Sequence, residues 1–107
     1  MIGLPDVEIE PRHWEIVRDI LRRYVPGHEV WAFGSRARKT AKAFSDLDLA
    51  VIADSPLSLE TSADLSAAFS ESGLPWKVDV VDWATTSDSF RKIIQAERVV
   101  LQPASSS

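Results

Sequence analysis

Two short apolar runs, residues 30–33 and 47–53, flank a polar and basic segment that begins with Gly34. Apolar runs of this length, bounded by turn-forming residues, are typical of buried β-strands. Two aspartates, Asp46 and Asp48, stand where the second run begins. The segment therefore predicts a strand, a turn, a short helix or loop, and a second strand that carries two carboxylates at its start. We expect the rest of the chain to act mainly as scaffold for it.

Hydrophobic periodicity and turn signals predict the other elements. In chain order they are a helix over 11–25, a strand over 29–33, a strand over 47–53, a helix over 58–72 capped by Ser58, a strand over 77–83, a helix capped by Thr86 or Ser87, and an edge strand over 99–101. This order, with its short connections, predicts an α/β (α+β) domain in which a small mixed β-sheet is flanked by helices. We assign residues 1–102 to this domain and residues 103–107 to a disordered C-terminal tail.

Composition narrows the functional classes. The chain has 107 residues and no cysteine, which excludes disulfides, zinc–thiolate sites and cysteine nucleophiles. Its formal net charge of −4 argues against a nonspecific grip on the nucleic-acid backbone. It contains neither a signal-peptide pattern nor a run of the ~20 apolar residues that span a membrane. We therefore expect a cytoplasmic protein with no membrane contact and no bulk nucleic-acid binding.

Asp46 and Asp48 form a candidate metal site. Because strand side chains alternate, residues two apart share a face, ~7 Å apart along the strand. Carboxylates this close repel each other and lose hydration, and a divalent cation relieves both costs. Oxygen ligands without cysteine or a nearby histidine favour Mg²⁺, with Mn²⁺ as the alternative, over zinc. The spacing also suits a pair of metal ions ~3.5–4 Å apart.

The strand over 77–83 supplies a third carboxylate. Asp79 lies among valines, where an unpaired charge would be costly. Asp82 is the alternative, but its odd spacing from Asp79 puts it on the opposite face of the strand. We favour Asp79 as the third ligand and keep Asp82 open.

The Gly34-Ser35 turn is a candidate phosphate site. A glycine at a strand end lets a phosphate approach the backbone closely, and the N–H groups and hydroxyl of Ser35 can face that phosphate if a helical turn starts there. Arg36 and Arg38 add fixed positive charge. Four of the twelve Lys and Arg residues lie between Arg36 and Lys42, and such a local cationic patch suits a small polyanion. Each feature alone is more often an ordinary turn or solvated surface, so the prediction depends on their combination.

The motif that starts at Gly34, namely Gly-Ser, ten residues and Asp-Leu-Asp, followed later by Asp79, resembles the signature of the DNA polymerase beta-like nucleotidyltransferase superfamily. The stretches GSRARKTAKAFSDLDLAV and WKVDVVDW are most similar to its minimal members, small proteins found beside a separate helical partner. The resemblance covers roughly residues 10–101. It implies the polymerase beta-like nucleotidyltransferase fold.

The resemblance also implies roles for the basic turn. Gly34 and Ser35 would bind the phosphates of a nucleoside triphosphate, with ATP as the expected one, and Arg36 and Arg38 would steer or hold phosphate. One departure is Lys39, which stands where relatives usually have glycine. We expect a helical turn there to tolerate the lysine.

The resemblance further implies that Asp46 and Asp48 hold two Mg²⁺ ions and that Asp79 shares one of them and helps to activate an acceptor hydroxyl. The implied reaction transfers a nucleoside monophosphate from the triphosphate to that hydroxyl and releases pyrophosphate. The chain has no room for an acceptor-holding domain, so we expect a small helical partner, either HEPN-like or substrate-binding, or else self-association. The implied roles are the antitoxin of a toxin–antitoxin pair or a two-component transferase for small molecules. The alternative is a non-catalytic module that neutralises its partner by contact.

Overall fold

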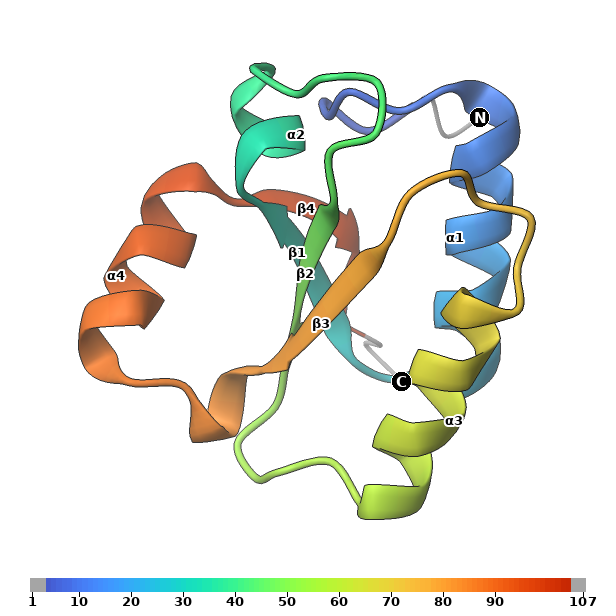
Figure 1. The fold of residues 1–107 in the computed structure, drawn as a ribbon. Coiled ribbons are helices and arrows are strands. Elements are labelled where there is room, and N and C mark those ends of the chain that lie inside the picture. The colour runs from blue at the N-terminus through green and yellow to red at the C-terminus, as the bar shows by residue number, and fades with distance from the viewer. Residues whose placement is uncertain (1–3, 105–107) are drawn as a thin grey trace.

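The computed structural model describes residues 4–104 and contains the predicted order of elements (Figure 1). The elements are α1 (Pro11–Tyr24), β1 (Glu29–Phe33), α2 (Ser35–Arg38), β2 (Leu47–Ile52), α3 (Leu59–Ser70), β3 (Val78–Asp82), a 3₁₀ turn (Trp83–Thr85), α4 (Asp88–Glu97) and β4 (Val99–Gln102). Only the 3₁₀ turn was not predicted. Pro103 and Ala104 follow β4 without regular structure, and the rest of the predicted tail, residues 105–107, lies outside the described residues.

The four strands form one mixed sheet in the order β3-β2-β1-β4. β1 pairs antiparallel with both β2 and β4, whereas β2 and β3 are parallel. The parallel pair follows from the connection through α3, because two parallel neighbours need a crossover between them. As a result, β2 and β3 begin at the same end of the sheet, and the aspartates near their starts can meet.

Helices cover the two faces of the sheet unequally. α1 and α3 lie together on one face, and α4 lies on the other (Figure 1). The larger core cluster lies under α1 and α3 and includes Leu21, Leu49 and Leu65, each no more than 1% exposed. The smaller cluster lies under α4 and consists of Trp31, Phe33, Ala50 and Ile94. The mixed sheet with helices on both faces confirms the predicted fold class.

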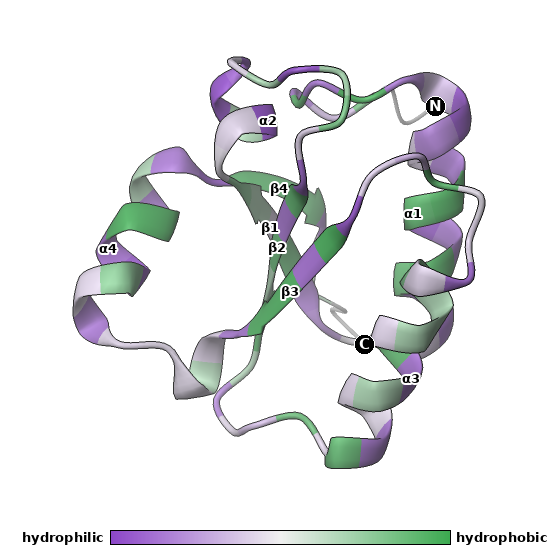
Figure 2. Ribbon diagram, viewed as in Figure 1, coloured by the Kyte–Doolittle hydropathy of each residue, from purple (hydrophilic) through white to green (hydrophobic). Residues whose placement is uncertain are grey.

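Serine side chains cap two of the helices. Ser58 accepts a hydrogen bond from the Thr61 N–H at the start of α3, as predicted. Ser87, rather than Thr86, caps α4 by accepting a bond from the Phe90 N–H. Figure 2 shows hydrophilic and hydrophobic residues alternating along the helices, while β2 and β3 are mostly hydrophobic with hydrophilic interruptions. Within residues 4–104, no helix is both long enough and apolar enough to cross a membrane.

Candidate active site

The site is built around two aspartates on neighbouring strands. Asp48 of β2 is the register partner of Asp79 of β3, and on its other side Asp48 is paired with Phe33 of β1. Strand alternation directs both carboxylates to the face covered by α4, opposite to Leu49. They open into a cleft of about 600 Å³. Five of the seven predicted site residues line this cleft: Gly34, Ser35, Arg38, Asp48 and Asp79.

Asp48 carries an electrostatic cost. Its pKa is raised above the ordinary value of an aspartate, first by burial and then by the nearby carboxylates of Asp79 and Asp46. Arg38 offsets part of this effect. Lys77 forms an ion pair with Asp79, at 3.3 Å between Nζ and Oδ1, but the Lys77 side chain is largely exposed and that of Asp79 is about half exposed. The centre of the site therefore holds more negative charge than its cationic neighbours neutralise, which fits a divalent cation.

Gly34 connects the aspartates to the basic turn. Its φ of 77° lies in the region that L-residues rarely adopt. A Cβ atom at this position would stand 2.3 Å from Oδ2 of Asp48, closer than any non-bonded contact allows. Glycine is therefore required here twice, for its backbone conformation and for the approach of the carboxylate. The predicted phosphate turn and the predicted metal ligand are in direct contact.

The Gly34 amide and Arg38 already share an anionic partner, Glu97, which was not predicted from the sequence. Glu97 is the last residue of α4. Its carboxylate accepts a hydrogen bond from the Gly34 N–H at 3.0 Å and forms an ion pair with Arg38 at 2.7 Å. Glu97 is 63 positions from Gly34 in the chain. No motif marks it, and only the packing of α4 across β1 brings it to the site.

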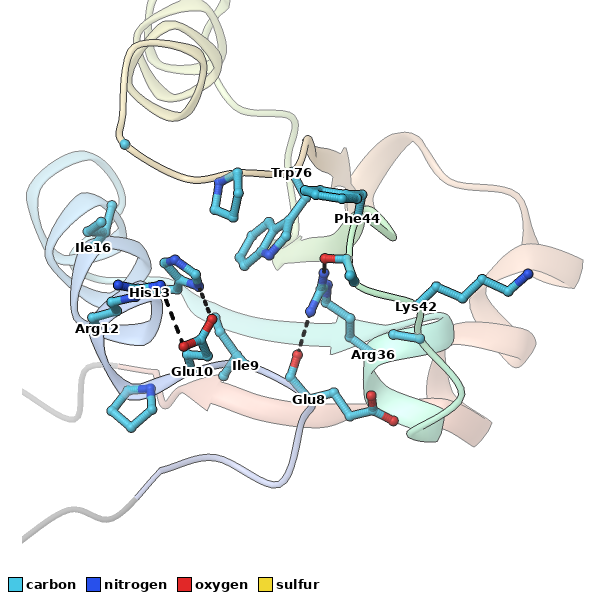
Figure 3. Close-up of a pocket in the computed structure, with 15 residues that line it drawn as sticks. Glu8, Ile9, Glu10, Arg12, His13, Ile16, Arg36, Lys42, Phe44 and Trp76 are labelled. Atoms are coloured by element: carbon cyan, nitrogen blue, oxygen red, sulfur yellow. Dashed lines mark hydrogen bonds and ion pairs between the residues drawn. The ribbon is translucent and has the colours of Figure 1, made fainter.

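Arg36 does not line the cleft that contains the other predicted phosphate-binding residues, Gly34, Ser35 and Arg38. The residue is 6% exposed and lies in a separate pocket, beside Glu8 and Trp76 (Figure 3). There its guanidinium lies 4.4 Å from the ring centroid of Trp76. It donates to the backbone carbonyls of Glu8, Ala43 and Ser45, at 2.7, 3.2 and 2.9 Å. Burial lowers its pKa, and the three bonds tie the N-terminal segment to the loop before β2.

Asp46 is only partly brought into the site. It precedes β2 by one residue and is exposed, although its charge contributes to the raised pKa of Asp48. Among the described residues, no three His, Cys, Asp or Glu side chains already converge as metal ligands. The predicted cluster therefore consists of an assembled pair, Asp48 and Asp79, and a third carboxylate held apart in the loop.

Asp82 has a different position, as strand alternation predicts. Its register partner is Val51, on the face covered by α1 and α3. Oδ2 accepts a bond from the Leu57 N–H at 2.8 Å, and Oδ1 accepts one from Ala84 N–H at 3.2 Å. Asp82 thus fixes the two loops that flank this end of β3. Of the two alternatives, Asp79 is the one that lies in the cleft with Asp48.

Lys39 does not sit in a helical turn, so that expectation is wrong. It follows the last residue of α2 in the left-handed conformation, with φ 62° and ψ 36°. A lysine there costs on the order of 1 kcal/mol relative to glycine. Its ammonium pairs with Asp6, which holds the N-terminal segment against the turn.

The geometry agrees with comparisons to known proteins. Residues 15–106 match the family described as polymerase beta, nucleotidyltransferase. The chain is 49% identical to the probable protein adenylyltransferase MntA of Haemophilus influenzae, over 95% of this chain and 90% of that protein. This family generally uses a divalent metal ion.

Solved structures share the fold. One is described as a toxin–antitoxin with AMP-PNP: it has a TM-score of 0.71 at 24% identity and covers 85% of this chain and 73% of that chain. Another is a tri-AMPylated Shewanella oneidensis HEPN toxin in complex with MNT antitoxin, with a TM-score of 0.67 at 21% identity over 90% of this chain and 74% of that chain. The family match over most of the sequence and the curated relative together identify this chain as a member of the polymerase beta nucleotidyltransferase family.

Proposed function

We propose that this protein transfers AMP from ATP to a hydroxyl group of a separate helical, HEPN-like partner protein and thereby acts as an antitoxin. The observation that carries the proposal is the single cleft in which Asp48 and Asp79 face Gly34, Ser35 and Arg38. Carboxylates that attract metal ions and donors that attract phosphate have one common ligand, a metal-bound nucleoside triphosphate. The relative named as a probable protein adenylyltransferase supports the same reaction.

The turn would bind the triphosphate. The Gly34 N–H and the Arg38 guanidinium are two donors that lie close enough to share one anion, as their common contact with Glu97 demonstrates. Ser35 lines the cleft beside them. These groups would hold the β- and γ-phosphates and direct the α-phosphate towards the aspartates. Positioning of this kind supplies much of the catalysis in phosphoryl-type transfers.

Asp46, Asp48 and Asp79 would hold Mg²⁺, two ions by analogy with the family. The bound ions would neutralise the pyrophosphate leaving group and favour ionisation of the acceptor hydroxyl. Asp48 would be stabilised most, because its pKa is raised first by burial and then by the neighbouring carboxylates, and a bound cation would offset both effects. Asp46 lies in a loop from which it can approach Asp48, so we expect the site to close when the cation enters.

The transfer itself breaks one P–O bond and forms another. The acceptor oxygen bonds to the α-phosphorus, the bond from that phosphorus to the bridging oxygen breaks, and pyrophosphate leaves. Asp79, on the edge strand β3, is the carboxylate more accessible to an incoming partner and would orient the acceptor hydroxyl and receive its proton. Arg38 would counter the charge that develops on the phosphate oxygens.

The partner assignment has separate support. Several solved structures with this fold are described as toxin–antitoxin complexes, and in one of them the HEPN toxin is tri-AMPylated. A protein hydroxyl as acceptor is consistent with the open cleft at the sheet edge. A module that neutralises its partner by contact alone would gain nothing from Asp48 and Asp79, whose repulsion has an energetic cost.

Labelled ATP tests the proposal. The chain and its HEPN-like partner are incubated with Mg²⁺ and ATP that is labelled at the α-phosphate, and the partner is examined for covalent label. We expect transfer by the wild type, loss of transfer in Asp48→Asn and Asp79→Asn, and full transfer in Asp64→Asn, an exposed control on α3. ATP labelled at the γ-phosphate should give none. Transfer that persists in Asp48→Asn would refute the site, and neutralisation of the partner without any label would favour the contact-only module.

A further inference from the structure

The carboxylate of Glu97 occupies the place where the proposed phosphate would bind. Oε1 accepts the Gly34 N–H at 3.0 Å, and Oε2 accepts from Nη1 of Arg38 at 2.7 Å. Both oxygens of one anion are thus engaged by the two donors that the turn offers to a ligand. A carboxylate and a phosphate present similar acceptor oxygens to such donors.

We propose that Glu97 is an internal competitor for the phosphate site and sets the affinity of this protein for nucleoside triphosphates. The inference rests on the proposed function, because it concerns the same site. In the absence of nucleotide, the Glu97 carboxylate accepts hydrogen bonds from both donors, the Gly34 N–H and Arg38. A triphosphate must displace it, because one set of donors cannot serve two anions and the two anions repel each other.

Charge and burial support a real contact rather than a passing one. The Glu97 side chain is 19% exposed. Burial alone would raise its pKa, but the hydrogen bonds from Arg38 and the Gly34 amide outweigh that effect and lower it. Glu97 is therefore ionised at neutral pH and binds as an anion. Its charge also contributes to the raised pKa of Asp48, so its departure would relieve part of the repulsion in the cleft.

The position of Glu97 on α4 makes displacement feasible without unfolding. Ile94, one turn earlier, is fully buried against the sheet and anchors this end of the helix. Arg38 is about half exposed, at 49% of its side chain, so the site opens to solvent on that side. Rotation of the Glu97 side chain alone would clear the two donors.

Isothermal titration with inorganic tripolyphosphate, and with a non-hydrolysable ATP analogue in the presence of Mg²⁺, tests the proposal. Glu97→Asp keeps the charge but shortens the side chain by one methylene, so it separates occupancy of the donors from the general field of the charge. If the donors are open for about a tenth of the time, freeing them tightens binding by up to about tenfold. We expect gains of about five- to tenfold for Glu97→Asp and Glu97→Gln. Glu60→Gln, an exposed control on α3, should bind like the wild type.

Four results would overturn the inference. Wild-type affinity in Glu97→Asp would mean that the carboxylate acts only through its charge, and weaker binding would mean that it holds Arg38 in place for the ligand. If the wild type itself fails to bind, the proposed function falls, and the inference with it. A second measurement needs no variant: the NMR signal of the Glu97 side-chain carboxyl should move towards that of an exposed glutamate as tripolyphosphate is added. A signal that stays in place while tripolyphosphate binds refutes displacement.

Discussion

The two faces of the sheet differ in what they bury. The face under α1 and α3 is closed by apolar side chains, and Val17, Leu21, Val30, Leu47, Leu49 and Val51 are all fully buried there. Among the described residues, the face under α4 buries four, and next to them it holds an open cleft and two aspartates whose charge is only partly neutralised. The face under α1 and α3 therefore supplies the stability that allows the face under α4 to hold carboxylates whose repulsion is destabilising. We therefore expect substitutions on the two faces to have different effects.

Truncation of the core should cost more on the closed face. Leu21→Ala should lower the free energy of unfolding by about 4 kcal/mol, because the cavity lies among side chains fixed on all sides. Ile94→Ala should cost about 2 kcal/mol, since α4 has no other fully buried residue and can settle into the space. Urea unfolding measures both changes. Equal costs would contradict the division between the faces.

Substitution of the two arginines of the turn, Arg36 and Arg38, should affect different properties: stability for Arg36 and nucleotide binding for Arg38. Arg36→Met should lower the free energy of unfolding by about 3 kcal/mol, because three backbone carbonyls lose their donor. Arg38→Met should cost less than about 1 kcal/mol, as expected for an exposed ion pair, and should instead weaken nucleotide binding. Thermal unfolding and nucleotide titration distinguish these outcomes. A stable Arg36→Met variant with impaired nucleotide binding would restore Arg36 to the phosphate site.

Gly34→Ala should damage both stability and activity. The added methyl group meets Oδ2 of Asp48, and the backbone is held at a positive φ. Strain of this kind costs about 2 kcal/mol, and displacement of Asp48 should reduce transfer by more than about tenfold. Gly27→Ala is the matched control, because a Cβ atom there meets nothing within 4 Å. If both variants behave alike, the close contact between the turn and Asp48 is unimportant.

Asp48→Asn should stabilise the protein in a pH-dependent manner when no metal is present. The pKa of Asp48 is raised on folding, so the folded state holds its proton more tightly than the unfolded state does. The wild type therefore loses stability as pH rises from the ordinary value of 3.8 through the raised value, and the loss is complete above it. The advantage of Asp48→Asn should be absent in acid and largest at neutral pH. Chemical unfolding at a series of pH values checks this, and an advantage that shrinks as pH rises would have the wrong sign.

Much of the fold could be read from local sequence. The apolar runs predicted β1 with its observed bounds and β2 to within one residue, because buried strands are coded by contiguous apolar residues. Ser58 and Gly34 were also predictable, since caps and strand-end turns depend on neighbouring residues. The spacing from Gly34 to Asp48 was enough to place the turn and the strand carboxylate in one site.

The errors and omissions have a common physical origin. Arg36 and Arg38 are equivalent in the sequence, and only contacts with Trp76 and with distant carbonyls turn Arg36 into a structural residue. Glu97 reaches the turn through the packing of α4, which no local pattern encodes. Lys39 adopts a left-handed backbone conformation, which a lysine in the sequence does not predict. Each is a tertiary contact or a backbone state that depends on residues far away in the chain.

The most direct test of the account is the Mg²⁺ dependence of nucleotide binding. A non-hydrolysable ATP analogue is titrated by calorimetry into the wild type, Asp79→Asn and the control Asp64→Asn, each with Mg²⁺ and with a chelator. We expect tight binding by the wild type and Asp64→Asn only when Mg²⁺ is present, and loss of that dependence in Asp79→Asn. Binding by Asp79→Asn that equals the wild type and still requires Mg²⁺ would show that the pair of aspartates at the start of β2 and β3 is not the metal site.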